Sequence, residues 1–445
     1  MMRPVTAIFA RAGASLFAFA LLVGGSAANG QTVGPASVEY TIQTGETLSA
    51  LGMRYFRRPG DYLRVQQFNS IARDRHIPVG RVILIPLEVL RSEPAEARVA
   101  GFRGAVRIAW RGPEAAAAVG QPVGEGAEIF TGVNAFVRIR LPDGGHISLP
   151  SNSRVRIERL RTVLLTGATD QDFRLDTGRV ETRAAPVRPG GSFQVTTPVA
   201  VAAVRGTEFR SAYFPGTVSA ATSVVEGAVA VRVTEGETIA QAGQGVVVSK
   251  DGARLLPLLA PPELPDTQLV QVGEAVTFRP APIPGAAFYR ARLAADAGMI
   301  DVFAEQDSDA EGVISFPDVA DGQYFVRLTG GAPEGLEGQA SSFAFLRART
   351  GIGTLATSAS GVGPERAYLF RWEAEGDGPG EFRFQLRSAD PDMPPVFDLA
   401  GLTEARVSLT GLEPGTYSWR VRITRYLSGR RLDVWSEPQQ LRIGG

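Results

Sequence analysis

The sequence predicts a multidomain, mainly β protein, and three observations support this fold class. The chain has 445 residues, and because a domain commonly spans about 100 to 200 residues, several domains are expected. It contains 51 glycines and 30 prolines, more than average usage, which favours turns and short strands over long helices. Short runs of alternating apolar and polar residues recur from residue 97 onward, which is the pattern of half-buried strands.

The composition excludes several kinds of chemistry. The chain has no cysteine, which excludes disulfides, thiolate metal sites and cysteine nucleophiles. Its 2 histidines cannot build a multi-histidine zinc site. The formal net charge is +0, Lys250 is the only lysine, and the sequence has no dense basic stripe of the kind that binds nucleic acid. We therefore expect a binding protein with no catalytic residue, no metal, no cofactor and no nucleic-acid partner.

The N-terminus has the three-part pattern of a secretory signal peptide. Arg3 and Arg11 precede an apolar run at 14–23, and small residues follow at 24–28. We expect cleavage after Ala28, and hence a mature chain in the periplasm or cell envelope. The alternative, an uncleaved anchor, is disfavoured because no further apolar length follows Ala28. No later segment reaches the roughly 20 apolar residues of a spanning helix, so we expect no transmembrane helix in the mature chain.

Residues 36–90 are predicted to form a small unit in the order strand, helix, helix, strand. Residues 44–47 form a turn whose side-chain oxygens can cap a helix. Asn69 is expected as a left-handed stop after the second helix. The apolar positions are Val38, Tyr40 and Ile42 in the first strand, Leu48, Leu51 and Tyr55 in the first helix, Tyr62, Val65 and Phe68 in the second, and 82–85 in the closing strand.

This unit resembles the lysin motif (LysM) family. The matching stretches are YTIQTGETLSALGMRYF (40–56), YLRVQQFNSI (62–71) and IPVGRVILIP (77–86). The resemblance implies binding of the N-acetylglucosamine-containing glycan of peptidoglycan or chitin, in a shallow groove between the first strand–helix loop and the second helix–strand loop. Family members usually have aspartate where this chain has Glu46, and Leu48 is also a candidate core residue. The groove residues that the resemblance implies are Gly45, Glu46, Thr47, Leu48, Asn69, Ile71, Arg73, Asp74, His76 and Ile77.

Residues 97–250 are predicted to form continuous β structure. Val137, Ile139 and Leu141 alternate with arginines, and the turn sequence PDGG at 142–145 leads into a second short strand. Strands spaced by about ten residues and separated by glycine turns favour a sandwich or a solenoid-like sheet over alternating β–α units.

The same region resembles the FecR-like domain. The matching words are VGEGAEIFTG (123–132), RLPDGGHISLP (140–150), LDTGRVETR (175–183), VTTPVAVAAVRGTEF (195–209), VVEGAVAV (224–231) and AGQGVVV (242–248). In its best-known members this domain passes a receptor's signal through a membrane helix to a cytoplasmic segment. This chain has no internal spanning segment, so that relay is not implied. The motif residues are Thr197, Pro198, Arg205, Gly206 and Thr207.

Within this motif, Arg205 is expected to pair inside the protein rather than to bind an anion. Gly206 is expected to supply a backbone shape that other residues disfavour.

The C-terminal part contains a repeat. VADGQYFVRLT (319–329) aligns with LEPGTYSWRVRIT (412–424), so that Gly322 matches Gly415 at a spacing of 415 − 322 = 93 residues. We expect two tandem β-sandwiches at 259–348 and 352–445, each resembling a fibronectin type III or Ig-like module. The glycine-rich stretch 351–363 is expected to be a linker.

Three functions fit these observations. The first is a non-catalytic envelope protein that binds peptidoglycan and presents its β domains to envelope protein partners. The alternative is a periplasmic sensory or regulatory component of FecR-type signalling. The third is a cell-wall hydrolase, which needs paired carboxylates in a cleft or a nucleophile with a base. No hydrolytic domain is recognisable, so we expect no enzyme.

Overall fold

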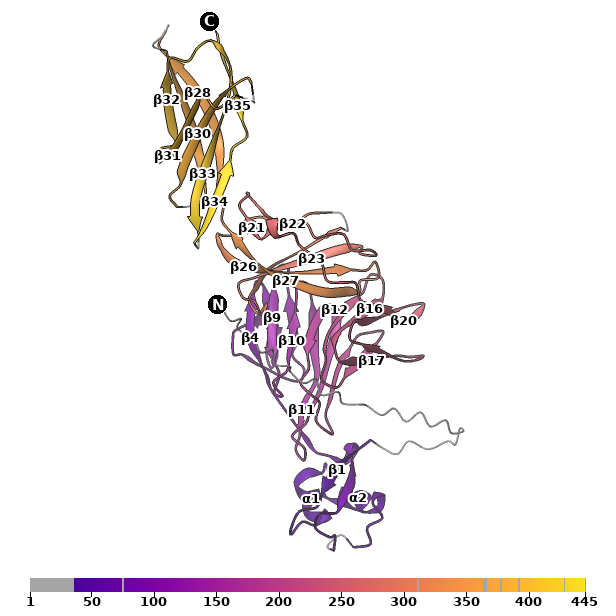
Figure 1. The fold of residues 1–445 in the computed structure, drawn as a ribbon. Coiled ribbons are helices and arrows are strands. Elements are labelled where there is room, and N and C mark those ends of the chain that lie inside the picture. The colour runs from indigo at the N-terminus through magenta and orange to yellow at the C-terminus, as the bar shows by residue number, and fades with distance from the viewer. Residues whose placement is uncertain are drawn as a thin grey trace, which may run out of the picture. The chain divides into compact units, whose positions relative to one another are not determined.

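The computed structural model describes residues 36–73, 76–309, 312–362, 366–376, 378–390, 393–427 and 429–444. The predicted signal peptide, residues 1–28, lies outside the described residues. The fold is mainly β with one small helical region, as predicted (Figure 1). None of the helices in the described part of the chain combines the length and the apolar character needed to span a lipid bilayer.

The helical region has the predicted strand, helix, helix, strand order. Strand β1 (Ser37–Thr41) pairs antiparallel with β2 (Val82–Pro86), and helices α1 (Leu48–Tyr55) and α2 (Tyr62–Phe68) come between them in sequence. Two 3-10 turns, η1 (Pro59–Asp61) and η2 (Leu87–Val89), follow α1 and β2. The predicted apolar faces meet in one core that includes Leu48, Leu51, Val65, Ile83 and Ile85. Phe68, which was expected on the same face of α2, is instead 38 % exposed.

The next region consists of two sheets that share one long strand, β12 (Figure 1). The first, here called the β15 sheet, has the order β7-β4-β9-β10-β12-β15-β16-β19-β20, and the second, the β13 sheet, has the order β6-β5-β8-β11-β12-β13-β14-β17-β18, with β3 also paired to β11. The strands are β3 (Ser92–Pro94), β4 (Ala97–Arg103), β5 (Val106–Ala109), β6 (Ala115–Ala116), β7 (Pro122–Val123), β8 (Glu128–Thr131), β9 (Phe136–Arg140), β10 (His146–Leu149), β11 (Arg154–Val163), β12 (Thr169–Arg183), β13 (Ser192–Thr196), β14 (Val201–Val204), β15 (Glu208–Phe214), β16 (Ser219–Glu226), β17 (Ala228–Val233), β18 (Gly236–Gln241), β19 (Gln244–Ser249) and β20 (Gly252–Pro257).

The core of this region lies between the two sheets. The predicted inward positions Val137, Ile139 and Leu141 are buried, together with valines from the opposite sheet such as Val229 and Val231. The alternation read from the sequence therefore identified the face that each strand buries.

Gly178 lies where β12 changes sheets. Residues up to Thr177 pair with β11, whereas Gly178 and the residues after it pair with β15. The φ angle of Gly178 is +83°, and a Cβ at this position would lie 2.4 Å from the carbonyl oxygen of Asn152. Both the backbone conformation and the available space therefore require glycine at this bend.

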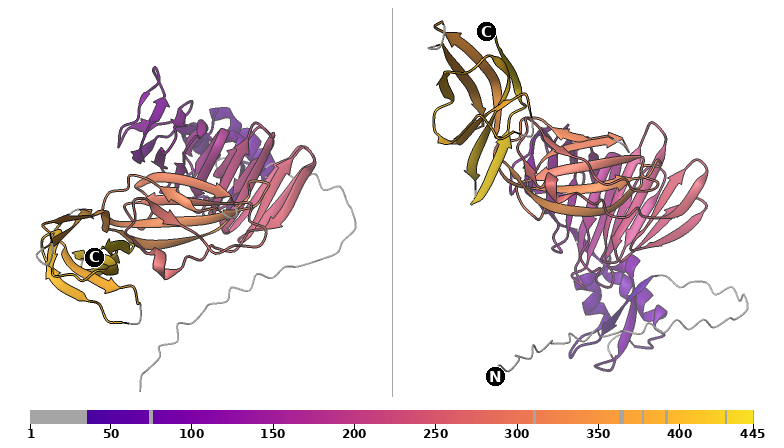
Figure 2. Two further views of the ribbon diagram at one scale, coloured as in Figure 1. Left: turned by 90° about the horizontal axis from the view of Figure 1, so that it is seen from above. Right: turned by 45° about the horizontal axis from the view of Figure 1, so that its top comes forward.

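The first C-terminal sandwich packs the five-stranded sheet β21-β27-β26-β23-β24 against the pair β22–β25. Figure 2 shows the strands of this sandwich in pink to orange from two further sides. Its core contains Phe278 and Phe345, whose ring centroids lie 5.2 Å apart. A 3-10 turn, η3 (Asp266–Gln268), precedes the first strand. The strands are β21 (Val270–Gln271), β22 (Val276–Phe278), β23 (Phe288–Ala294), β24 (Val302–Asp309), β25 (Ile314–Phe316), β26 (Gly322–Gly331) and β27 (Glu337–Arg347).

The second sandwich packs the sheet β28-β29-β32 against the sheet β31-β30-β33-β34, in which β35 also pairs with β33. Strands β26 and β33 begin at the aligned glycines of the sequence repeat, Gly322 and Gly415. The strands are β28 (Gly351–Ser360), β29 (Ala367–Glu375), β30 (Glu381–Ser388), β31 (Phe397–Leu402), β32 (Arg406–Thr410), β33 (Gly415–Leu427), β34 (Arg430–Trp435) and β35 (Gln439–Ile443).

The linker expected at 351–363 is wrong for most of its length. Residues Gly351–Ser360 form β28, which pairs with β29. Glycine and small polar residues dominate this stretch, but Ile352 and Leu355 pack against the sandwich core. The burial of these two side chains outweighs the low strand propensity of the glycines.

Candidate functional site

The first predicted groove loop, residues 44–47, is held by its own side chains. The Thr47 hydroxyl accepts a hydrogen bond from the backbone N–H of Ala50 at 3.1 Å and so caps α1, as predicted. The Glu46 carboxylate accepts the Tyr40 hydroxyl at 2.7 Å and the backbone N–H of Gln43 at 2.9 Å. Gly45 has a φ of +81°, and a side chain there would meet open space. Glutamate in place of the usual aspartate therefore links the loop to strand β1.

The contact between Tyr40 and Glu46 gives a pH-dependent prediction. Burial, the hydrogen bond to Glu46 and the negative charge of that carboxylate raise the pKa of Tyr40 to about 12. Because the folded pKa exceeds the unfolded value of 10.0, this contact should stabilise the domain fully below pH 10 and lose its effect as the pH rises to about 12. Subtracting the phenolate absorbance of the Tyr40→Phe variant from that of the unmodified protein isolates the signal of Tyr40. The titration midpoint of this difference should lie near pH 12.

Two glutamate variants complete this test. Glu46→Gln should move the midpoint of Tyr40 towards 10, because it removes the charge that opposes ionisation. Glu39→Gln, at an exposed position on the same strand, should leave the midpoint in place. A midpoint near 10 in the unmodified protein would show that the Tyr40–Glu46 contact does not form in solution.

The second predicted groove loop follows α2, and Asn69 fixes its start. The Asn69 side-chain amide donates to the carbonyl oxygens of Val65 at 2.8 Å and Leu84 at 2.7 Å, and its oxygen accepts the Leu84 N–H at 2.7 Å. This side chain therefore ties α2 to β2 and is not free to bind a glycan. The predicted left-handed conformation belongs to the next residue, Ser70, with a φ of +51°, whereas Asn69 has a φ of −99°.

The two loops come together at their bases. The Ile42 N–H donates to the Arg81 carbonyl at 3.0 Å, and the Gly80 N–H donates to the Ile42 carbonyl at 2.9 Å. These bonds hold the end of β1, just before the first loop, against the end of the second loop. The backbone thus brings together the two segments between which the groove is expected.

The predicted groove residues divide into buried and exposed groups. Leu48, Ile71 and Ile77 are 0, 6 and 8 % exposed and belong to the core, so their side chains offer little contact to a ligand. Arg73 and His76 are exposed, and the His76 N–H donates to the Arg73 carbonyl at 3.3 Å. Asp74 lies outside the described residues. On the second loop, the groove candidates with exposed side chains are therefore Arg73 and His76, beside the backbone of the first loop.

The second predicted motif, at 197–207, is divided between a turn and a strand end. The Thr197 hydroxyl donates to the Ala200 carbonyl and accepts the Ala200 N–H, both at 3.0 Å, so that residues 197–200, including Pro198, make a tight turn between β13 and β14. Gly206 has a φ of +89°, and a Cβ there would lie 3.0 Å from the Pro186 Cα, which explains the glycine.

The other two residues of this motif differ in burial. Thr207 is buried at 4 % exposed. Arg205 is exposed and has no side-chain partner among the described residues. The expected internal pairing of Arg205 is therefore wrong.

A buried charge cluster that the sequence analysis missed joins the β15 sheet to the first sandwich. Arg292 is bonded through Nε to Glu305 at 2.6 Å and through Nη1 to Glu181. Arg290 pairs with Glu337, whose side chain is 7 % exposed. The cluster, here called the interdomain charge cluster, consists of Arg179, Glu181 and Arg210 from β12 and β15, and Arg290, Arg292, Glu305 and Glu337 from β23, β24 and β27.

The electrostatics of this cluster favour the ionised form of Glu337. Burial opposes the charge of Glu337, but the guanidinium groups of Arg290, Arg292 and Arg210 outweigh it and hold the pKa of this carboxyl below its ordinary value. Strand β23 is buried along nearly its whole length and yet carries two arginines, and this burial is visible only in the structure. Such arginines need carboxylate partners from a neighbouring element.

Comparison with protein families identifies two of the regions described above. The LysM domain family matches residues 40–86, and the FecR protein family matches residues 127–230. The chain carries a LysM domain and a FecR domain. The LysM domain comprises the helical unit, whose two loops frame the predicted groove. The FecR domain lies within the two-sheet region and includes the turn at 197–200.

Solved structures show only distant likeness. Two structures described as "putative anti-sigma factor" from Parabacteroides distasonis share 20 and 15 % identity with this chain, cover 29 and 42 % of it, and have TM-scores of 0.25 and 0.26. The alignments span 59 and 85 % of those two structures. The FN1–FN3 domains of chicken CNTN1 share 11 % identity over 65 % of this chain and 98 % of that structure, with a TM-score of 0.23. No curated protein matches the sequence.

Proposed function

We propose that this protein is exported to the cell envelope, where its LysM domain binds the N-acetylglucosamine-containing glycan of peptidoglycan and its β domains bind envelope proteins without catalysing a reaction. The observation that carries this proposal is the LysM match at 40–86, together with the two loops that the Ile42 hydrogen bonds hold side by side. A single shallow site binds weakly, and the repeated glycan raises its effective concentration.

The recognition chemistry fits the exposed parts of these loops. An acetamido group offers one hydrogen-bond donor and one acceptor, which loop backbone groups can match. Because the Asn69 amide is committed to α2 and β2, we assign side-chain contacts to Arg73 and His76. Both are exposed on the second loop.

Co-sedimentation with purified peptidoglycan sacculi tests the proposal. The full mature chain should sediment with sacculi, and the double variant Arg73→Ala/His76→Ala should bind about tenfold more weakly, a change of roughly 1.4 kcal/mol. Arg58→Ala, which removes an exposed arginine just before η1, is the matched control and should bind normally. Absence of sedimentation of the unmodified chain would refute peptidoglycan binding.

Point variants are preferable to deletion of residues 36–90. Val163 on β11 is 6 % exposed and belongs to the core of the LysM domain, and Leu165 packs against that core. Deletion of the LysM domain would expose the side chains of Val163 and Leu165 and so disturb the two-sheet region to which they belong. In the same assay, release of soluble cell-wall fragments would instead support the hydrolase.

The FecR match favours a second function, a sensory or regulatory component of the envelope. Crosslinking of the full chain in intact cells, followed by identification of the captured protein, separates the two proposals. Capture of an outer-membrane receptor or of a regulator of transcription would favour signalling. Capture of structural envelope proteins would favour the scaffold.

A further inference from the structure

A pocket of about 470 Å³ opens at one end of the two-sheet region, between the β13 sheet and the β15 sheet. One wall comes from the β13 sheet, through the turn at 197–200 and the end of β17. The other wall comes from the β15 sheet, through the end of β19 and the turn into β20. This volume lies within the range of small-molecule sites.

The inner part of the pocket is apolar and continuous with the domain core. Ala200 and Val248 line it and belong to the buried core at 9 and 5 % exposed, and Val199 and Val233 line it and pack against that core. The Thr197 hydroxyl is bonded to both backbone groups of Ala200, so the shape of this wall is fixed. An apolar side chain placed here would be removed from water.

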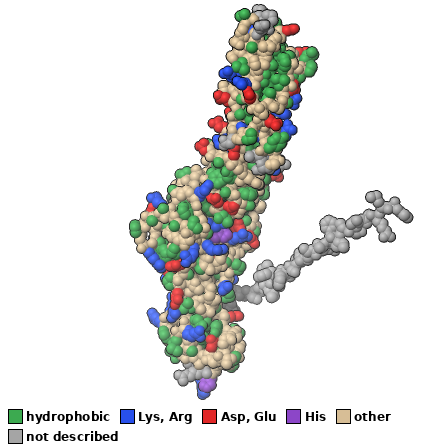
Figure 3. Space-filling view, turned by 90° about the vertical axis from the view of Figure 1, so that its left-hand side faces the viewer, with side chains coloured by type: hydrophobic (Ala, Val, Ile, Leu, Met, Phe, Trp, Pro, Cys, Tyr) green, Lys and Arg blue, Asp and Glu red, His purple; other side chains and the backbone are tan. Residues whose placement is uncertain are grey.

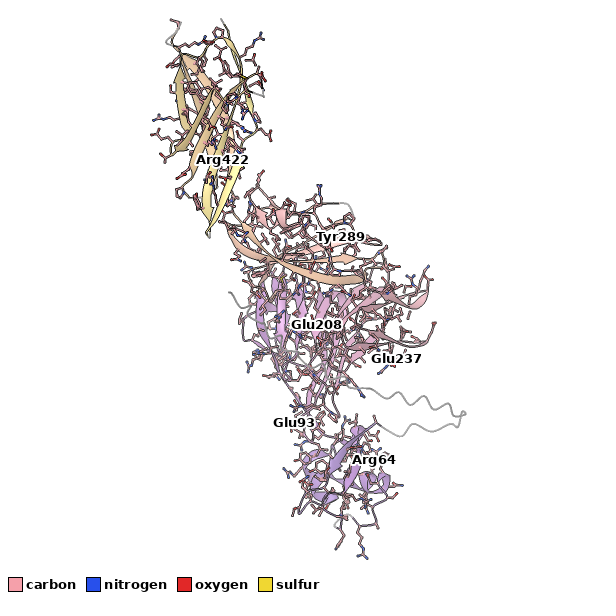
Figure 4. All side chains as sticks on the ribbon, in the orientation of Figure 1. Arg64, Glu93, Glu208, Glu237, Tyr289 and Arg422 are labelled. Atoms are coloured by element: carbon pink, nitrogen blue, oxygen red, sulfur yellow. The ribbon has the colours of Figure 1, made fainter. Side chains whose placement is uncertain are left out.

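Besides Arg232, the rim carries two side chains of opposite charge. Lys250 and Glu235 both line the pocket and are exposed. Within the described ranges, neither side chain forms a hydrogen bond or an ion pair, with each other or with any other residue. By contrast, Arg232 on the same wall is bonded to Glu237 at 2.7 Å (Figure 4 labels Glu237).

We propose that this pocket binds an α-amino acid or a dipeptide that has an apolar side chain and both ends free. The ligand carboxylate pairs with the Lys250 ammonium, the ligand ammonium pairs with the Glu235 carboxylate, and the apolar side chain enters between the sheets against Val199, Val233 and Val248. A ligand of a single charge would leave one of the two rim groups uncompensated. This inference does not depend on glycan binding by the LysM domain.

The uniqueness of Lys250 makes a direct test possible. Reductive ¹³C-dimethylation of the full chain labels only Lys250 and the terminal amine, and keeps the charge of both. The Lys250 signal is assigned by its absence in Lys250→Arg. Addition of leucine, alanine or dialanine should shift this signal in a saturable manner, and the three probes distinguish a free amino acid from a dipeptide as the preferred ligand.

Capped probes and one matched variant decide the outcome. N-acetyl-leucine and leucinamide, which each lack one charge, should bind at least about tenfold more weakly than leucine. Glu235→Gln should weaken leucine binding to a similar extent, whereas Glu226→Gln, at an exposed glutamate on β16 outside the pocket, should not. No saturable shift with any of the three probes, or equal binding of capped and uncapped leucine, would overturn the proposal.

Discussion

Replacing Glu337 by alanine should lower the free energy of unfolding of the FecR domain and the first sandwich by about 3–5 kcal/mol, the usual cost of removing one partner from a buried ion pair. Glu337 lies in the interdomain charge cluster, bonded to Arg290 and within 4 Å of Arg179 and Arg210, at 3.6 and 3.9 Å. Its removal leaves these buried guanidinium groups short of a carboxylate. Denaturant unfolding of the full chain measures the loss.

Asp307 supplies a matched control on the same arginine. Its carboxylate also pairs with Arg290, at 2.7 Å, but its side chain is 50 % exposed. Because solvent screens this pair, Asp307→Ala should cost no more than about 1 kcal/mol. Equal losses in the two variants would contradict a buried cluster and would indicate that water reaches Glu337.

The same cluster predicts how stability depends on acid. The guanidinium groups hold the pKa of Glu337 below its ordinary value of 4.5, so the folded state keeps this charge at a pH where the unfolded chain binds a proton. Its contribution to stability is therefore complete above about pH 4.5 and is lost as the pH falls through the lower, folded value. The Glu337→Ala variant should therefore lose less unfolding free energy than the unmodified chain as the pH falls below about 4.5. Denaturant unfolding of both proteins across this pH range measures the difference.

The sequence predicted best those features that local residues determine. The LysM domain was recognisable because its strands, helices and capping Thr47 lie within one short stretch, and its α1 cap was found as expected. The alternation at Val137 and Ile139 likewise identified a buried face. In these cases a pattern within a short stretch of sequence was enough to predict the local structure.

Long-range contacts were beyond such reasoning. Glu181 and Arg292 are 111 positions apart, and Arg179 and Glu305 are 126 apart, so no local pattern joins them. On the face shown in Figure 3, acidic and basic side chains are interspersed, and sequence alone does not say which of them become buried partners. The pocket at Lys250 was missed for the same reason, since its walls come from two different sheets.

The exposed candidates in the LysM groove show a related limit. The family pattern correctly placed Leu48, Ile71 and Ile77 near the loops, but burial assigns their side chains to the core. A family motif identifies the positions of the loops but does not show which side chains at those positions are exposed to solvent. Accessibility depends on the packing of the whole domain.

The second sandwich gives the other prediction with a large effect: Trp419→Ala should destabilise this sandwich by about 3–5 kcal/mol. Trp419 is 2 % exposed, and its ring lies 5.1 Å from that of Phe370 and 5.8 Å from that of Phe384 between the two sheets. Alanine would leave a large cavity and remove these aromatic contacts.

Trp435 provides the comparison, because it lies on β34, next to the strand of Trp419, but on the outer face. Its ring is only partly buried, with the Arg420 guanidinium 4.2 Å from its centroid, so Trp435→Ala should cost about 1 kcal/mol or less. Three of the 4 tryptophans of the chain, Trp372, Trp419 and Trp435, are in this sandwich, and Trp372 remains in both variants as a fluorescent reporter of its unfolding. If Trp435→Ala proved as costly as Trp419→Ala, the assignment of inner and outer faces on β33 and β34 would be wrong.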